Sequence, residues 1–395
     1  MVHWSHGGSR SFNGGCADRR LLFNNAVRLG TPALSDAAAP RGGWYRTMDP
    51  FTHALLGAAI GQGVAGRRFG RRAALWGAAA GAAPDLDMLL GFEFFAQLRL
   101  HRGFTHALWF GPAAGWLWAW LLVRRGRRRG RAEPLQSWFW VLALALLSHA
   151  LLDACTTYGT QLLAPFSDRR FSWHVIPVIE PRYTLILIAG LAAGWWLRAR
   201  AQWFALAAVL TSGLYLGWGW WLNQRAIDLA EAQLAAQEVD AEVHAFPTLM
   251  QLVQRRLVAF ADGEVRVGLV DAAAPACIAW GWAPRQPHPL VDRLRDTREG
   301  AIFSWFTDGV ETWQVGDTPD GWRVEISDLR YGLDTDARQG LWGVRAEFGR
   351  DGRLRAAPEH FYAPIDWSWR TLQSWVLGAE LRSCAAGIAA LPPRQ

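Results

Sequence analysis

The chain has 395 residues, of which 51% are hydrophobic, and its formal net charge is +7. This length allows two or three domains. Most of the positive charge is arginine that lies between apolar segments, whereas a nucleic-acid-binding protein would line one polar face with basic residues. The composition therefore favours a membrane protein in contact with the lipid bilayer, and we expect no nucleic-acid partner.

The cysteines are spread along the chain and form no C-x-x-C motif. The sequence therefore offers no thiolate zinc site of the usual kind. Cys277 and Cys384 can be bridged if their domain is extracytoplasmic, because disulfides persist in oxidising compartments. Nothing in the sequence requires that pairing.

Residues 1–47 are rich in Gly, Ser, Arg and Ala and show no apolar periodicity. They lack the sustained apolar stretch that forms the core of a signal peptide. We expect Met48 to be the functional start, and the preceding segment to be disordered or a mis-assigned N-terminal extension.

Residues 48–222 are dominated by Ala, Leu, Gly, Trp and Val and are predicted to form a multi-pass membrane domain. The first of its apolar segments is marginal as a span, because about 20 residues are needed to cross the hydrocarbon core. The predicted segments are 52–66, 73–91, 104–123, 137–155, 183–198 and 203–222.

Arginines between these segments predict an orientation. Arginine-rich loops join the first segment to the second, the third to the fourth and the fifth to the sixth. The positive-inside rule places such loops in the cytoplasm, so the opposite ends of the segments face outward. The loop arginines are Arg67, Arg68, Arg71, Arg72, Arg124, Arg125, Arg127, Arg128, Arg129, Arg131, Arg198 and Arg200.

Residues 223–395 have ordinary polarity and are predicted to form a soluble domain. Its first part, 223–245, is rich in helix formers. The remainder resembles strands separated by Asp-Gly turns at Asp262, Asp320 and Asp351, the signal for tight hairpins. The expected fold is an α-helical polytopic membrane domain followed by a small, mostly β α+β extracytoplasmic domain.

Carboxylates and imidazoles from separate segments converge on the predicted outer face. His149 and Asp153 are spaced i,i+4, which places them on one side of a helix. His53 at the start of the first segment falls on the same face, where it fits a ligand or a packing residue equally well. The remaining candidates are Asp85, Asp87, His101 and His106.

These residue types predict a metal site. Three carboxylates and three imidazoles suit one or two divalent cations, and we expect zinc, with manganese as the alternative. Asp85 or Asp87 can serve as ligand or general base. Arg102 can contact an anionic group of the substrate.

At these positions the sequence resembles the membrane-bound, metal-dependent hydrolase family, also described as LexA-binding, inner-membrane-associated hydrolases. The resemblance covers about residues 48–222 and implies a multi-pass protein of the bacterial inner membrane that starts at Met48. Two positions depart from the family pattern: Ala107 replaces a frequent Ser, and Glu180-Pro181 replaces a frequent Asp-Pro. The matching motifs are Met48–Ala59, Ala74–Asp87, His101–His106, Ser148–Ser167, Arg170–His174 and Ile326–Gly332.

The functional prediction is a metal-dependent hydrolase at the outer face of the inner membrane. Its substrate would be a small phosphoester or a lipid, cleaved by metal-activated water, because no Ser or Cys nucleophile motif is present. One alternative is a non-enzymatic, metal-stabilised membrane scaffold that binds a protein partner through 223–395. A transporter is a third possibility, although its ionisable residues should lie near mid-bilayer.

Overall fold

The computed structural model describes residues 49–363, except 91, 275–276 and 333. All of these residues belong to one compact unit. The predictions for 1–47 and for Met48 as the start lie outside the described residues. Cys277 is disulfide-bonded. Cys384, which the sequence leaves open as its partner, lies outside the described residues.

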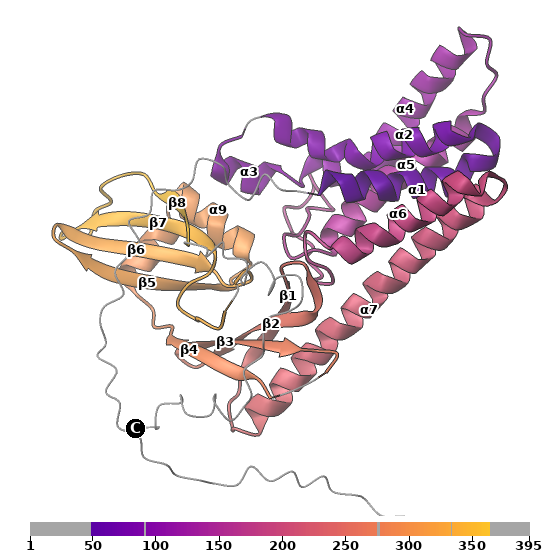
Figure 1. The fold of residues 1–395 in the computed structure, drawn as a ribbon. Helices are drawn as coiled ribbons and strands as arrows, with labels where there is room; N and C mark the ends of the chain where they lie inside the picture. The colour runs from indigo at the N-terminus through magenta and orange to yellow at the C-terminus, as the bar shows by residue number, and fades with distance from the viewer. Residues whose placement is uncertain (1–48, 91, 275–276, 333, 364–395) are drawn as a thin grey trace, which may run out of the picture. The chain divides into compact units, whose positions relative to one another are not determined.

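Each predicted apolar segment contains a helix. The α1 helix packs against α2, α5, α6 and α7 (Figure 1). The main helices are α1 (Pro50–Phe69), α2 (Arg71–Ala82), α4 (Phe110–Arg127), α5 (Leu135–Ala154), α6 (Pro181–Trp196) and α7 (Ala201–Ala235). Shorter helical pieces are η2 (Pro84–Leu90), α3 (Phe94–Leu100), η3 (Phe104–His106) and η4 (Arg198–Arg200).

Within the described residues, α5 and the stretch Arg198–Ala235 are long and apolar enough to cross a membrane. The predicted segment 73–91 is not one helix, because α2 ends at Ala82 and the chain turns into η2 at Pro84. Proline removes a backbone donor and disfavours helix at the residue before it. The α7 helix instead runs past residue 222, the predicted domain boundary, and ends at Ala235.

Glycines bring α1 and α2 into direct backbone contact. A Cβ atom on Gly57 would lie only 2.2 Å from the carbonyl oxygen of Gly77, and one on Gly81 would lie 2.4 Å from the carbonyl oxygen of His53. Small residues permit this close approach between helices in membranes. As a result the start of α1 lies against the end of α2.

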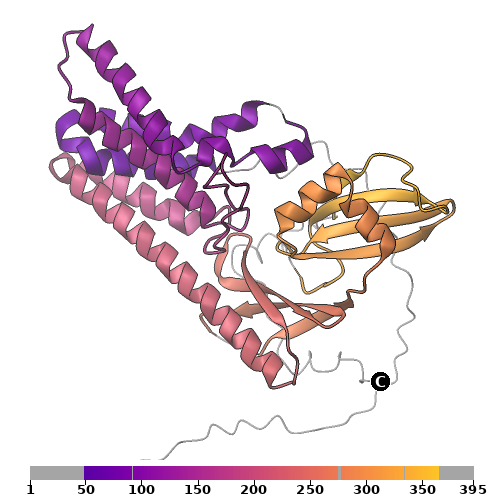
Figure 2. The ribbon, with the colours of Figure 1, turned by 180° about the vertical axis from the view of Figure 1, so that it is seen from behind.

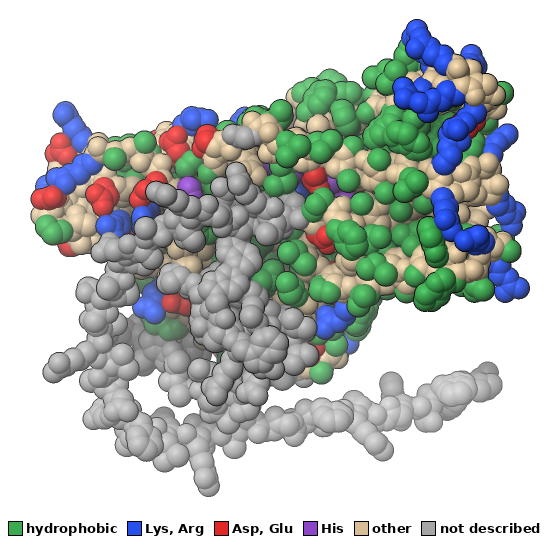
Figure 3. Space-filling model, turned by 45° about the horizontal axis from the view of Figure 1, so that its top comes forward, with side chains coloured by type: hydrophobic (Ala, Val, Ile, Leu, Met, Phe, Trp, Pro, Cys, Tyr) green, Lys and Arg blue, Asp and Glu red, His purple; other side chains and the backbone are tan. Residues whose placement is uncertain are grey.

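Arginine side chains gather at one end of the helical region, and hydrophobic side chains cover its sides (Figure 3). Arg67 and Arg68 lie in the last turn of α1, whereas α2 begins at Arg71. The last turn of α4 likewise carries Arg124 and Arg125. The opposite ends of these helices carry no arginine. The candidate site residues lie on those ends or next to them.

Two antiparallel sheets follow α7, with strand orders β1-β2-β3-β4 and β5-β6-β7-β8. The predicted hairpins at Asp262 and Asp320 are confirmed between β2 and β3 and between β5 and β6. Asp351 lies in a turn after β7, closed by a bridge from Phe348 to Leu354. The elements are β1 (Glu242–Thr248), β2 (Gln251–Ala261), β3 (Glu264–Asp271), β4 (Ala279–Pro284), α8 (Pro289–Arg295), α9 (Arg298–Thr307), β5 (Glu311–Thr318), β6 (Gly321–Asp328), β7 (Trp342–Gly349) and β8 (Glu359–Tyr362).

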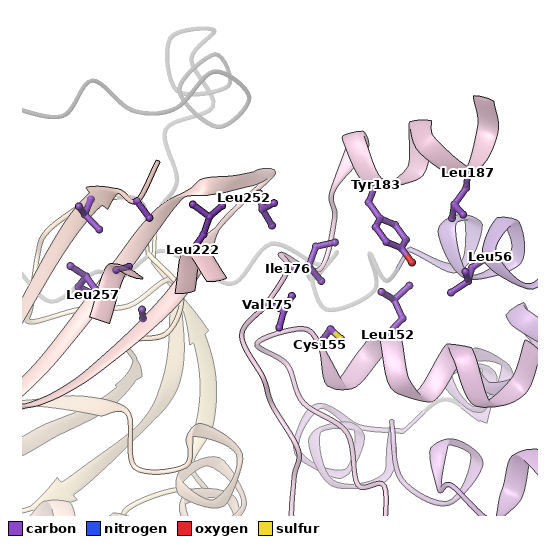
Figure 4. Close-up of a cluster of buried hydrophobic side chains, with 14 of the residues drawn as sticks. Leu56, Leu152, Cys155, Val175, Ile176, Tyr183, Leu187, Leu222, Leu252 and Leu257 are labelled. Carbon is purple, nitrogen blue, oxygen red and sulfur yellow. The ribbon is translucent and has the colours of Figure 1, made fainter. Parts of the chain in front are cut away.

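One buried cluster of apolar side chains joins helices to strands. Leu152, Tyr183 and Ile176 pack in it together with Leu222 and Leu257 (Figure 4). The α7 helix also packs on β1 and β2 (Figure 2). The segment between α5 and α6 therefore lies in a core built by both regions.

Candidate metal centre

Two carboxylates and two imidazoles meet inside the helical region. Asp85 comes from η2, His106 ends η3, and His149 and Asp153 lie on the last turns of α5. One ligand atom from each residue lies within 4.8 Å of all the others. The Asp85 side chain is 8% exposed, and the other three are at most 1% exposed. This buried cluster has the composition and spacing to hold a metal ion.

The backbone of α2 orients His149. The Nδ1 atom of His149 lies 2.6 Å from the carbonyl oxygen of Gly81. A carbonyl oxygen only accepts hydrogen bonds, so Nδ1 carries the proton and donates it. In the neutral ring, Nε2 is then an unprotonated acceptor that faces the cluster.

Hydrogen bonds through Thr105 orient the His106 ring so that its Nδ1 also carries the proton. The Thr105 hydroxyl donates to Oδ2 of Asp87 at 3.0 Å. Its oxygen therefore accepts from Nδ1–H of His106, 2.9 Å away. The other Asp87 oxygen accepts from Nδ1 of His101 at 2.8 Å. Nε2 of His106 is thus also an acceptor in the neutral ring, as in metal sites whose ligating histidines donate their other N–H to a polar group.

The distances suit a tetrahedral cation site. The two Nε2 atoms lie 3.0 Å apart, and Oδ2 of Asp153 lies 3.2 Å from His106 and 3.3 Å from His149. Oδ1 of Asp85 lies 3.7 Å and 3.4 Å from the same nitrogens. Ligands about 2.1 Å from a zinc ion are about 3.4 Å from one another. Nitrogen and oxygen donors at this spacing fit zinc.

The second oxygen of Asp153 is held from the opposite side. Oδ1 lies 2.8 Å from a guanidinium nitrogen of Arg102 and 3.2 Å from Nε2 of His53. Arg102 is 2% exposed and also donates to the Thr156 hydroxyl at 2.8 Å. These contacts direct Oδ2 of Asp153 toward the two imidazoles.

The structure divides the predicted residues into three groups. Asp85, His106, His149 and Asp153 form the cluster. Asp87 and His101 form an adjacent pair that supports His106 through Thr105. His53 contacts Asp153, and its ring lies 3.9 Å from that of His149, centre to centre.

A small pocket of about 20 Å³ lies beside the cluster. Its wall includes His53, Arg102 and Asp153, together with Glu180 and Tyr183. Glu180 caps the start of α6, and burial raises the pKa of its carboxyl group. Glu180 was not among the predicted site residues, because an acidic residue in a loop is usually solvated; its place at the Asp-Pro position of the family pattern was the signal that pointed to it.

Known proteins resemble this chain in its helical region and, in one case, over 72% of its length. The model of the YdjM inner membrane protein family matches residues 48–226. The inner membrane protein YbcI of Escherichia coli is 37% identical over 143 residues, which are 34% of this chain and 79% of that protein. The chain belongs to the YdjM inner membrane protein family.

A second relative is the uncharacterized protein YfhP of Bacillus subtilis. It is 28% identical over 295 residues, which are 72% of this chain and 87% of that protein. No solved structure matches the chain. The family and the name of YbcI support an inner-membrane location.

Proposed function

We propose that this member of the YdjM family is a metal-dependent hydrolase of phosphoesters or lipids. The observation that carries the proposal is the convergence of two imidazole acceptors, 3.0 Å apart, with two carboxylate oxygens in a buried site. When both rings are neutral, four acceptors with no proton between them repel one another strongly in a low-dielectric interior. A divalent cation turns this repulsion into attraction.

Asp85, His106, His149 and Asp153 would hold the cation, and zinc suits them best, with manganese as the second choice. A divalent cation supplies Lewis-acid chemistry, because it lowers the pKa of water and polarises a phosphoryl or carbonyl oxygen. Oδ2 of Asp85 is buried without a hydrogen-bond partner among the described residues, so it can take a proton from the attacking water.

Asp87 has a different role in this proposal. Both of its oxygens are engaged, one by His101 and the other by Thr105. It therefore orients His106 and is not the general base. Arg102, whose guanidinium holds Asp153, orients that carboxylate and lines the small pocket beside the cluster.

The same proposal places the centre at the outer face of the membrane. In α1 His53 and the arginines occur at opposite ends, and the arginine-rich loop before α5 lies at the end opposite to His149 and Asp153. Arginine-rich ends favour the cytoplasmic side. A multi-pass arrangement with an extracytoplasmic domain after α7 follows from this orientation. Lipid esters would then reach the centre at headgroup depth.

The first test is the metal content of the full chain purified in detergent. We expect about one equivalent of zinc or manganese in the parent and at least a tenfold loss in the double variant Asp85→Ala/His106→Ala. The matched control is Asp336→Ala/His244→Ala, whose side chains are 40% and 31% exposed and lie outside the cluster. Absence of metal from the reconstituted parent would contradict the proposal.

Hydrolysis is tested next on p-nitrophenyl phosphate, bis(p-nitrophenyl) phosphate and phospholipid vesicles. The second candidate function is a metal-stabilised scaffold that binds a protein partner through the region after α7. The burial of all four ligands favours this function, because structural metal sites are closed. Metal-dependent turnover that is absent in Asp85→Asn supports the enzyme. A parent that binds metal, loses thermal stability on chelation and hydrolyses no probe supports the scaffold.

A further inference from the structure

Three segments outside the long helices supply or adjoin residues of the metal centre. They are residues 84–90, which form η2, residues 103–109, which contain η3, and residues 161–167, which follow α5. All ionisable side chains in these segments are turned inward and are at most 8% exposed. They are Asp85, Asp87 and His106. The polar groups of the segments are thus kept away from the surface.

Every exposed residue of the same segments is apolar. Phe166 is 87% exposed, and Leu89 and Leu90 are 79% and 69% exposed. Single exposed leucines are ordinary on a protein surface, whereas a contiguous apolar patch marks a surface that contacts a partner or a membrane. We name this set the apolar rim: Leu86, Leu89, Leu90, Phe104, Leu108, Trp109, Leu163, Pro165 and Phe166.

Hydrogen bonds join the three segments of the apolar rim. The Thr105 hydroxyl joins the second segment to η2. The backbone N–H of Leu108 donates to the carbonyl oxygen of Leu162 at 2.9 Å. The indole N–H of Trp109 donates to the carbonyl oxygen of Ala164 at 2.6 Å. The segments are therefore held side by side, and their apolar side chains form one surface.

The apolar rim is continuous with the apolar sides of the helices. The ring of Phe104 lies 4.9 Å from that of Trp109 and 5.7 Å from that of Phe110, centre to centre. Phe110 begins α4, which packs on α5. The α5 helix is long and apolar enough to cross a membrane, and it exposes Trp140 and Leu144. The rim thus extends the surface that these helices present to lipid.

Other loops of the same chain are built in the opposite way. In the turn after β7, the side chains of Asp351 and Arg353 are 62% and 88% exposed. The loop before α5 exposes Arg128 and Arg129. Charged loops of this kind suit water or lipid headgroups. The apolar rim is instead unfavourable in water and stable in hydrocarbon.

We propose that the apolar rim inserts among the acyl chains of the leaflet that adjoins the metal centre, and that the substrate is a lipid phosphoester drawn from that leaflet. The choice of substrate rests on the proposed hydrolase function, whereas the insertion does not. The inner-membrane location of the family supplies the lipid.

Residues of the apolar rim and of the metal cluster are neighbours along the chain. Leu86 directly follows Asp85 in η2. Phe104 lies two residues before His106. A lipid whose acyl chains contact Leu86 and Phe104 therefore keeps its phosphate close to the cluster. In its hydrolysis the hydroxyl group of water bonds to phosphorus as the ester bond from phosphorus to oxygen breaks, and the other water proton goes to the departing alcohol oxygen.

Spin labels test the insertion without any assay of turnover. A nitroxide is attached to Leu89→Cys and to Phe166→Cys in the full chain, reconstituted in bilayers of phosphatidylethanolamine and phosphatidylglycerol. Collisions with oxygen, which concentrates in hydrocarbon, are compared with collisions with a water-soluble nickel chelate. We expect the ratio of oxygen to nickel collisions at both sites to exceed that at the exposed control Arg353→Cys by at least about fivefold, because the hydrocarbon core holds no water. Leu214→Cys on α7 is the reference for lipid, and the labelled parent gives the background of native cysteines.

Hydrolysis assays test the substrate class. The parent receives dioleoyl phosphatidylglycerol in bilayers or its deacylated headgroup, glycerophosphoglycerol, in water. We expect kcat/KM to be at least about 100-fold higher for the lipid, because binding energy from the acyl chains can act at the reacting bond. Leu89→Glu/Phe166→Glu should lower lipid hydrolysis by about tenfold or more, since charge in hydrocarbon is costly. The matched control is Leu354→Glu, at a 40% exposed leucine in the turn after β7, which should leave the rate unchanged.

An equal collision ratio at the rim sites and at Arg353→Cys would place the rim in water and overturn the insertion. Labels shielded from both oxygen and nickel would show that protein covers the rim and would overturn it as well. Equal hydrolysis of the lipid and of its headgroup would overturn the choice of a lipid substrate. A parent with inserted labels that hydrolyses neither these probes nor the aryl phosphates would contradict the proposed hydrolase function and leave the insertion supported.

Discussion

Nε2 of His106 and Nε2 of His149 lie 3.0 Å apart in the interior of the protein. Each ring donates its Nδ1–H elsewhere, to the Thr105 hydroxyl and to the Gly81 carbonyl. Neither neutral ring has a proton for the other. The two Nε2 atoms can therefore bind one cation together, and the first two predictions follow from this.

The Thr105 relay should control metal affinity without providing a ligand. Thr105→Val removes both the acceptor for His106 and the donor to Asp87, so His106 loses its fixed tautomer. We expect zinc affinity to weaken by about 10- to 100-fold, the usual effect of losing such a partner. Competition with a fluorescent chelator measures it. Thr105→Ser retains the hydroxyl and should bind zinc nearly as the parent does; an equal loss in both variants would contradict the relay.

Metal binding should stabilise the folded protein. A ligand at 100 times its dissociation constant, bound only by the folded state, adds about 2.7 kcal/mol to the free energy of unfolding. We expect zinc to raise the thermal unfolding temperature of the metal-free parent, and a chelator to reverse the rise. Asp85→Asn should show no such shift. A similar rise in both proteins would locate the zinc effect outside the cluster.

The contact between α1 and α2 should tolerate no side chain at its closest point. In Gly77→Ala the new Cβ would lie 2.2 Å from the carbonyl oxygen of Gly57, and backbone must move. We expect a loss of about 1–3 kcal/mol, as for other overpacked interiors, measured by thermal unfolding in detergent. The matched control is Gly213→Ala in α7, where nothing lies within 4 Å. Better helix propensity should leave that variant as stable as the parent or slightly more stable.

Arg255 should anchor the segment between α5 and α6. It is buried and donates to the carbonyl oxygens of His174, Val175 and Gly219 at 2.9, 3.1 and 2.7 Å. Arg255→Met leaves these carbonyls without their donor, and we expect a loss of at least about 2 kcal/mol. Limited proteolysis should then cut residues 155–180 faster than in the parent. Arg353→Met alters a side chain that is 88% exposed and should change neither quantity.

His174 should make the protein less stable in acid. Burial lowers the pKa of its imidazole from 6.5 to about 3. Between these values the unfolded state binds more protons than the folded state, so the free energy of unfolding rises with pH and falls on acidification. Chemical unfolding at pH 7.5 and pH 5 should show a smaller loss in His174→Gln than in the parent. His244→Gln, at a half-buried position on β1, is the control. An unchanged slope in His174→Gln would contradict this assignment.

Local sequence patterns were sufficient for several parts of the fold. The apolar segments contain helices, and the Asp-Gly pairs at 262 and 320 form hairpins. Gly263 adopts the positive φ that such a turn requires. The i,i+4 spacing of His149 and Asp153 was enough to place them on one face of α5. Each of these features depends on residues that are close along the chain.

Tertiary structure decided which candidates meet. Asp85 and Asp87 are the same residue type, but they lie in a 3-10 turn, where side chains two residues apart point about 120° apart around the axis. One carboxylate therefore faces His106 and His149, and the other faces His101 and Thr105. The pairing of Arg102, between α3 and η3, with Asp153 on α5 likewise joins segments that are distant along the chain. Sequence by itself determined the helices, the hairpins and the polar residues at one set of helix ends. Contacts between distant segments determined which four of these polar side chains converge, because side-chain direction depends on how helices pack.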